Sequence, residues 1–346
     1  MANSSFVLGL ALVYFPLVLW LARRLPGERW QIMAAIPVAR EGSGWQGRNL
    51  TFYGLLTAAA IMLGVSIFLL LLAAVGMPLW RGLALVSAIG GAAVIASGVV
   101  ARVVEGKKNT FTVAGGAAVG LYLTPPVVWL FERGFGTGIG MMPVLAALAV
   151  AYILGEGVGR LACLSFGCCY GKPLSQLGPR LRRLFAPFAC AYQGETKKIV
   201  YASGLAGEPV APIQALTSLL YGGMGLAGIY LFLEGRFAAA FGLTAIFALA
   251  WRILSEQLRA DFRGESKLTA YQRLGLINII CCLALLRLLP APAAPLPVDL
   301  TVGLAVLWQP GLLLLLQGLW LALFLHFGLS RVTAATLAFH VRRDQV

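Results

Sequence analysis

The stretch WRILSEQLR (251–259) places two arginines and a glutamate on one side of a predicted helix. Arg252, Glu256 and Arg259 are spaced i, i+4 and i+7, so they form a single charged stripe. A guanidinium is a planar fork that binds phosphate oxygens, and one carboxylate can hold two such forks in place. The stripe therefore predicts a binding site for a phosphate diester; a solvated helix end without a site is the alternative.

A third arginine ends an apolar run in GEGVGRLACLSFGCCYGKP (155–173). Glu156 and Arg160 are four residues apart and share a helical face, where they can form a structural or a functional ion pair. In APIQALTSLLYGG (211–223), Gln214 lies in a first helical turn, from which it could reach a lipid oxygen. Polar groups in apolar segments are costly and usually functional. Together these residues predict a cavity at one membrane face that accepts an anionic lipid headgroup.

A lipid bilayer is the solvent that this composition requires. The chain has 346 residues, of which 60% are hydrophobic and 12% charged, and its mean hydropathy is +0.85. A spanning helix needs about 20 mostly apolar residues. Nine segments satisfy this: 6–22, 51–76, 82–104, 113–131, 141–161, 210–233, 238–258, 272–289 and 302–328. We therefore predict an all-α polytopic membrane protein.

Positive charge is distributed unequally between the two predicted membrane faces. All but four of the 27 Lys and Arg residues fall on the side of GRLACLSFGCCYGKP. The other four are Arg81, Arg133, Arg236 and Arg287. The positive-inside rule then places that side in the cytoplasm, with the N-terminus outside and the C-terminus inside. A site for anionic headgroups would also gather cations on its own face, which is a competing explanation.

The six cysteines favour neither a disulfide framework nor a metal site. Four of them, Cys163, Cys168, Cys169 and Cys190, lie on the basic side, where a reducing cytosol would keep them as thiols. A zinc site needs four convergent thiolates or histidines, and the only histidines, His326 and His340, are near the C-terminus. We expect no metal and no cofactor.

The order and content of these segments resemble the prolipoprotein diacylglyceryl transferase family. Residues 155–173 are similar to its GR-x-G-N-x-x-N-G signature, with the G-C-C-Y-G ending of some members. Four further segments resemble family motifs in the same order: NLTFYGLLTAAAIMLG (49–64), AIGGAAVIASGVVARVV (88–104), TFTVAGGAAVG (110–120) and APIQALTS (211–218). WRILSEQLR stands where the family has R-x-x-x-E-x-x-R. The likeness covers about 70% of the chain.

This resemblance implies a seven-helix core with one added transmembrane helix at each end. The core would be residues 48–290, including an extramembrane insert at 171–209. Residues 1–47 would be an N-terminal anchor and basic linker. Residues 291–346 would be a Pro-rich connector, an extra span and a basic tail.

The resemblance also implies a reaction. The family moves the diacylglyceryl unit of phosphatidylglycerol to a prolipoprotein cysteine, forming a thioether and releasing glycerol phosphate. By position, Arg160, Arg252 and Arg259 would bind the phosphate, and Glu256 would orient these arginines. The implied substrate-binding residues are Tyr53, Gly159, Gly167, Gly171, Gln214 and Arg259. The implied partners are phosphatidylglycerol, a prolipoprotein or another acceptor, and membrane lipids, with no nucleic acid; the implied location is the bacterial cytoplasmic membrane.

The chain departs from the family pattern at several positions, and one of these is ALT (215–217), which stands where the family has L-Y-E. Ala114 and Ala211 replace two histidines, and Cys163 and Phe166 replace the signature asparagines. The usual general base for an incoming thiol is therefore missing, and Glu256 or Tyr53 are the available substitutes.

The family's signature side faces the periplasm, whereas the charge distribution favours the cytoplasm. Two alternatives therefore stay open: a paralog with a cytoplasm-facing site and a different acceptor, or a non-catalytic anionic-lipid-binding protein. A transporter or channel is less favoured, because no charged residue lies near the middle of a predicted span.

Overall fold

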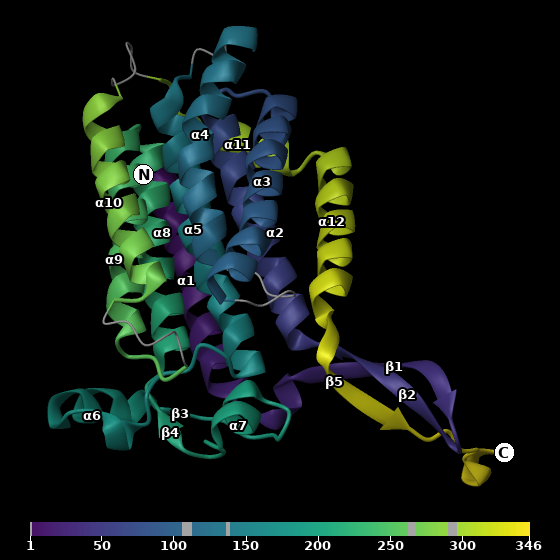
Figure 1. Ribbon diagram of the computed structural model, residues 1–346. Helices are drawn as coiled ribbons and strands as arrows, with labels where there is room; N and C mark the ends of the chain where they lie inside the picture. The colour runs from purple at the N-terminus through teal and green to yellow at the C-terminus, as the bar shows by residue number, and fades with distance from the viewer. Residues whose placement is uncertain (1, 106–112, 136–138, 262–267, 290–295) are drawn as a thin grey trace.

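The computed structural model describes residues 2–105, 113–135, 139–261, 268–289 and 296–346 as a bundle of long helices (Figure 1). The long helices are α1 (Ala2–Arg24), α2 (Phe52–Ala74), α3 (Leu79–Glu105), α4 (Val113–Phe135), α5 (Met141–Phe166), α8 (Ile213–Leu233), α9 (Phe237–Glu256), α10 (Ala270–Leu288) and α12 (Pro310–Gly328). Within the described residues, eight helices are long and apolar enough to cross a bilayer, and α4 occupies the one remaining predicted segment, 113–131. The predicted all-α polytopic fold is confirmed.

Helix α5 is the centre of the bundle. It packs against α2, α8 and α9, and most of its side chains are buried, which is why its sequence is apolar on every face. Small residues bring α2 and α5 together: a Cβ on Gly155 would lie 3.1 Å from the Ala60 carbonyl oxygen, and one on Gly64 would lie 3.2 Å from that of Ala151. Such close crossings are typical of helices in lipid. The polar end of α5 is therefore held firmly against three neighbours.

A three-stranded antiparallel sheet projects from the end of the bundle where α5 ends, which we call the motif end (Figure 1). Strands β1 (Ile32–Glu41) and β2 (Gly44–Thr51) form a hairpin, and β5 (Leu329–Leu337) pairs with β2. The sequence predicts only a linker and a tail at these segments, without strands. The pairing joins the N-terminal linker to the C-terminal tail.

The predicted last span is divided into two helices. Helix α11 (Leu300–Leu307) ends before Gln309, and Pro310 starts α12, where the missing N–H of proline costs no hydrogen bond. Both pieces pack on α2. A Cβ on Gly54 would lie 2.1 Å from the Cα of Gly328, so α12 crosses α2 at backbone contact.

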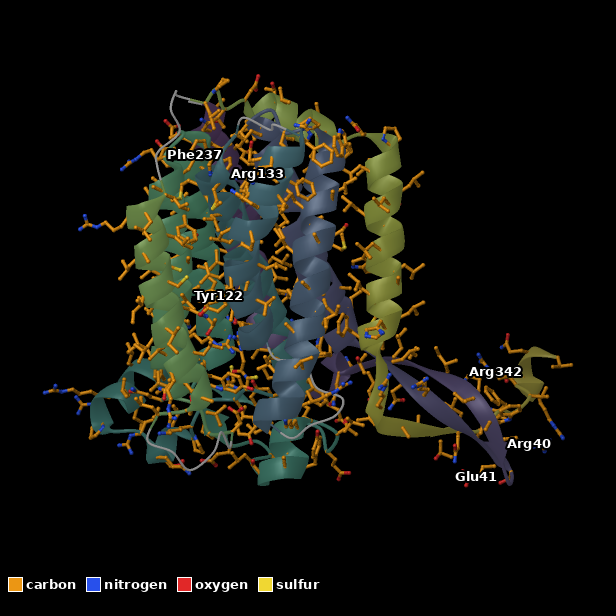
Figure 2. All side chains as sticks on the ribbon, turned by 45° about the horizontal axis from the view of Figure 1, so that its top comes forward. Arg40, Glu41, Tyr122, Arg133, Phe237 and Arg342 are labelled. Carbon is orange, nitrogen blue, oxygen red and sulfur yellow. The ribbon has the colours of Figure 1, made fainter. Side chains whose placement is uncertain are left out.

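The two ends of the chain lie at opposite ends of the bundle (Figure 1). Helix α1 begins beside the end of α8, where Asn3 Nδ2 donates to the Leu233 carbonyl at 3.3 Å. Arg40 and Arg342 lie at the far tip of the sheet, away from Arg133 (Figure 2). An odd number of crossings is consistent with this arrangement. Four cations counted on the motif side lie outside the described residues: Lys107, Lys108, Arg263 and Lys267.

The insert between α5 and α8 covers the motif end of the bundle (Figure 1). It contains α6 (Pro179–Phe185), α7 (Lys198–Ser203) and a two-stranded antiparallel pair, β3 (Cys190–Ala191) with β4 (Pro209–Val210). These elements hold the loop that follows α5, and that loop contains the glycines and cysteines of the motif.

Candidate functional site

One buried carboxylate joins two arginines from different helices at the motif end. Glu156 Oε1 accepts a hydrogen bond from Arg160 Nη2 one turn later in α5, and one from Arg252 Nη1 of α9 at 3.1 Å. The glutamate side chain is 3% exposed, and the arginine side chains are 13% and 14% exposed. We call these three residues the arginine pair with its bridging glutamate.

The arginine pair has one positive charge more than its bridging glutamate can neutralise. Within the described residues, the Nε groups of Arg160 and Arg252 are buried and have no hydrogen-bond partner. Buried N–H groups are normally paired, and an unpaired one is costly. The surplus charge and the unused donors together favour an anion with several acceptor oxygens, such as a phosphate diester.

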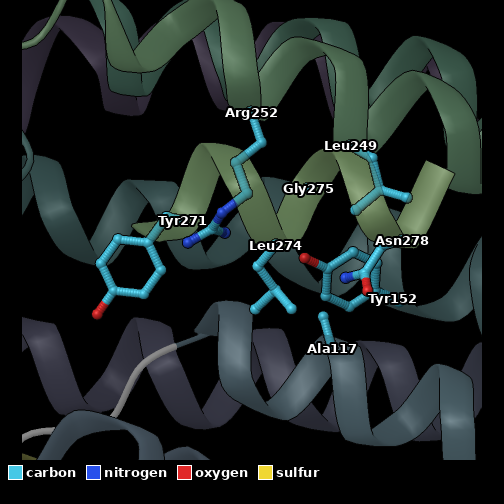
Figure 3. Close-up of a pocket in the computed structure, with 8 residues that line it drawn as sticks. All are labelled: Ala117, Tyr152, Leu249, Arg252, Tyr271, Leu274, Gly275 and Asn278. Atoms are coloured by element: carbon cyan, nitrogen blue, oxygen red, sulfur yellow. The ribbon is translucent and has the colours of Figure 1, made fainter. Parts of the chain in front are cut away.

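A small hollow borders Arg252 (Figure 3). Its lining residues come from α4, α5, α9 and α10: Ala117, Tyr152, Leu249, Arg252, Tyr271, Leu274, Gly275 and Asn278. Its volume of about 10 Å³ is near the minimum for one water molecule. The Arg252 guanidinium carbon lies 6.0 Å from the centre of the Tyr271 ring, which is a cation–π distance. Arg252 thus contacts both Glu156 of α5 and the Tyr271 ring of α10.

Arg259 lies in the turn after α9. Its Nε and Nη2 donate to the two carboxylate oxygens of Asp261 at 2.8 and 2.7 Å. The orienting role predicted for Glu256, the last residue of α9, stays a prediction. The structure shows that the carboxylate joining Arg160 to Arg252 belongs to Glu156, which lies on a different helix from Arg252.

The loop after α5 is held between the end of α9 and strand β4. The Lys172 N–H donates to the Leu258 carbonyl at 2.9 Å, and the Ala260 N–H donates to the Tyr170 carbonyl at 3.1 Å. On the other side, the Ala211 N–H donates to the Lys172 carbonyl at 2.9 Å. These bonds bring Gly171 and Arg259 into register as a short antiparallel bridge. The backbone of Arg259 therefore lies directly beside the motif loop.

The other predicted substrate-binding residues lie around the same loop. Tyr53 of α2 packs its ring on Phe166 at a centroid distance of 5.7 Å. Gln214 Nε2 donates to the Cys168 carbonyl at 2.9 Å. Gly159 packs against Ala60 of α2, and Gly167 ends α5 in the left-handed conformation with φ of +73°. The structure thus brings all nine predicted site residues to the motif end.

The sequence profile described as prolipoprotein diacylglyceryl transferase matches residues 45–288. The chain belongs to this family. The match contains seven long helices of the described residues, α2 to α5 and α8 to α10, and leaves α1 and α12 outside it. Among curated proteins, no sequence matches the chain. Membership in the transferase family supports a lipid-modifying transferase in a multi-pass membrane protein.

Three of the positions at which the chain departs from the transferase family pattern lie at the motif loop, and one of them is Phe166, the last residue of α5. Ala211 is fully buried against Gly171, and Cys163 lies one turn beyond Arg160 on α5. Ala114 belongs to α4, and its side chain is outside the described residues. The alanine at position 211 supplies no proton acceptor, so the thiol chemistry of the family needs another group here.

Three cysteines meet at the motif loop. The sulfurs of Cys163, Cys168 and Cys169 all lie within 4.8 Å of one another. The left-handed turn at Gly167 returns Cys168 to the end of α5, where its N–H donates to the Cys163 carbonyl at 3.1 Å. Hydrogen bonds from the other two thiols, and then the charges of Arg259 and Arg160, lower the pKa of Cys169. We call these residues the thiol cluster; sequence spacing alone did not predict it.

Gly171 is required for the close approach of the loop to β4. A Cβ on this residue would lie 2.3 Å from the Ala211 carbonyl oxygen and 2.8 Å from the Ala211 Cβ. We expect Gly171→Ala to separate these segments, to destabilise the protein by about 1–3 kcal/mol and to displace Arg259. Thermal unfolding and lipid binding of the purified protein would measure this. Gly178→Ala is the control, because its Cβ would meet nothing within 4 Å; equal behaviour of the two variants would contradict the prediction.

Lys197 is a buried cation that ties the insert to two helix ends. Its Nζ donates to the carbonyls of Leu25, after α1, and Ser165, in the last turn of α5, at 3.1 and 2.7 Å. Burial lowers the pKa of Lys197 from 10.5 to about 8, and Glu28 opposes the shift. Between these values the unfolded chain binds a proton that the folded chain has lost, so stability rises with pH across this window.

Lys197→Met should remove that rise in stability. The wild-type protein is expected to gain about 2–3 kcal/mol from the lower to the upper end of the window, since one pKa unit corresponds to about 1.4 kcal/mol. The variant should be less stable below the window, because two carbonyls lose their donor. Thermal unfolding in detergent at pH values below, within and above the window would measure both effects. Lys198→Met is the control, and a wild-type slope in Lys197→Met would exclude Lys197 as the cause.

Proposed function

We propose that this protein transfers the diacylglyceryl group of phosphatidylglycerol to a cysteine thiol of a prolipoprotein, in a bacterial cytoplasmic membrane. The observation that carries the proposal is the arginine pair with its bridging glutamate, whose surplus charge and unused N–H groups lie buried at one end of the bundle. Membership in the transferase family agrees with this reading.

The proposed step exchanges one bond for another at a glycerol carbon. The acceptor sulfur bonds to the carbon that carries the phosphate ester, the C–O bond breaks, and glycerol phosphate leaves with the electron pair. Arg160 and Arg252 would bind the phosphate and stabilise its growing charge as the bond breaks. Glu156 fixes the two guanidiniums, so little reorganisation is needed during the reaction. Arg259 and Gln214 would bind the glycerol phosphate from the loop side.

The experiment is transfer by the purified protein in lipid. Vesicles of phosphatidylglycerol and a peptide containing a lipobox cysteine are the substrates, and release of glycerol phosphate and the peptide mass are the readouts. We expect the peptide to gain one diacylglyceryl group and to yield equimolar glycerol phosphate. Vesicles of phosphatidylethanolamine and a peptide with serine in place of cysteine are the controls. Absence of product from phosphatidylglycerol would overturn the proposal.

The distribution of charge favours a second candidate, the same lipid chemistry at a cytoplasm-facing site with a different acceptor. The motif end contains most of the basic residues, including Arg180, Arg182 and Arg183 of α6. Cysteine labelling by a membrane-impermeant reagent can separate the two candidates. Leu184→Cys suits this test, since Leu184 is 61% exposed whereas native Cys190 is buried. Labelling from outside the cell favours the first candidate, and protection in intact cells favours the second.

A further inference from the structure

The thiol cluster lies beside groups that the proposed reaction uses. The charges of Arg160 and Arg259 act on Cys169, and the hydroxyl of Tyr53 lies within electrostatic range of all three thiols. Each of the three cysteines is partly exposed rather than buried.

The backbone holds the three sulfurs together. Among the described residues, Cys169 is the only non-glycine residue with a positive φ, at +58°. This conformation is costly for most side chains. The hydrogen bonds of Tyr170 and Lys172 to the end of α9 hold the loop in this shape. Backbone strain of this kind persists only where surrounding structure enforces it, and it gathers at functional sites.

The spacing of the sulfurs suits a thiophilic metal ion. Zinc–sulfur bonds are about 2.3 Å, so tetrahedral coordination places two ligand sulfurs about 3.8 Å apart. The observed limit of 4.8 Å requires only a small adjustment of side chains. The expectation of no metal assumed a closed site with four protein ligands, whereas catalytic zinc uses three and leaves one position open.

The charges are also compatible. A zinc ion with three thiolates has a net charge of −1, and the guanidiniums of Arg160 and Arg259 lie close enough to compensate it. The carboxylates of Glu156 and Asp261 are paired, Glu156 with Arg160 and Arg252 and Asp261 with Arg259. The cluster is therefore a group of three soft ligands beside two cations.

We propose that Cys163, Cys168 and Cys169 bind a Zn²⁺ ion whose fourth position accepts the acceptor's cysteine thiol. This inference rests on the proposed function and supplies the thiol activation that Ala211 cannot. A thiol that coordinates zinc is deprotonated, and its proton passes to water. The bound sulfur then forms the C–S bond as the C–O bond of the lipid breaks, and the phosphate leaves with the electron pair toward Arg160.

The test begins with metal analysis of the full-length protein purified without chelators. We expect about one zinc per chain in the wild type, and at least fivefold less in Cys163→Ser, Cys168→Ser and Cys169→Ser. Cys281→Ser is the matched control, since Cys281 lies on α10 outside the cluster. Removing zinc from the wild type with a chelator, and restoring it, tests the same point without any substitution. Cobalt in the emptied site should give the absorption of a thiolate-to-metal charge transfer.

The outcomes separate this inference from the proposed function. Zinc-dependent transfer to the lipobox peptide supports both. Zinc bound by the three cysteines without transfer keeps the metal site and removes the proposed function. Transfer that survives chelation and the three serine variants keeps the function and overturns the metal site. Copper in place of zinc, or a disulfide among the three cysteines in the purified protein, also overturns it.

Discussion

Replacing Arg160 with alanine is expected to reduce diacylglyceryl transfer by a factor of about 10²–10³. The guanidinium of Arg160 is buried, and its Nε–H has no hydrogen-bond partner within the described residues. Of the two arginines in the pair, Arg160 is the one closer in sequence to the motif loop. Removing one preorganised donor to a developing negative charge typically costs about 3–4 kcal/mol of transition-state stabilisation. Stability should fall much less, because Glu156 keeps Arg252 as its partner. Turnover of phosphatidylglycerol in vesicles would measure the effect.

Two comparisons make the Arg160 result specific. Arg160→Lys keeps the charge but loses the planar fork, so its activity should lie between those of the wild type and the alanine variant. Arg287→Ala makes the same deletion at the exposed, opposite end of the bundle and should leave turnover unchanged. If Arg160→Ala retained turnover within about tenfold of wild type, binding of the phosphate by this residue would be wrong.

The membrane fold could be read from the sequence because length and apolarity largely determine a transmembrane helix. The spans around Arg160 and Arg252 were therefore predicted close to their observed limits. The sheet was missed because pairing of Arg48 with Ala334 joins residues that are distant in the chain and mostly exposed, so no apolar alternation marks the strands. The division of the last span into α11 and α12 could have been predicted from Pro310, since proline favours the first turn of a helix.

The candidate site was predictable in composition but only partly in its contacts. The i, i+4 spacing of Glu156 and Arg160 indicated their ion pair, which the structure contains. The bond from Arg252 to the same carboxylate depends on how α9 packs on α5, and a single sequence does not specify that packing. The thiol cluster also depends on a left-handed turn at Gly167 and a strained Cys169. Local propensities do not predict such strained positions, because the surrounding structure enforces them.

Replacing Glu156 with glutamine is expected to produce the largest combined loss of stability and activity. The glutamate is 3% exposed and accepts from both arginines, so its neutralisation leaves two buried guanidiniums without a counter-charge. Breaking a buried ion pair by removing one partner typically costs about 3–5 kcal/mol. Thermal unfolding in detergent should show this loss. Transfer should also fall at least about 100-fold, because the guanidiniums lose the contact that orients them.

A double variant separates the two roles of Glu156. Glu156→Gln with Arg252→Gln removes one charge of each sign, so the remaining net charge of the group equals that of the wild type. The double variant should therefore be more stable than Glu156→Gln alone, since neighbouring substitutions of this kind are not additive. Its transfer activity should nevertheless be lower still, because one of the two phosphate-binding forks is gone. If activity recovered together with stability, the arginine pair with its bridging glutamate would serve only the fold. The phosphate would then have to bind elsewhere.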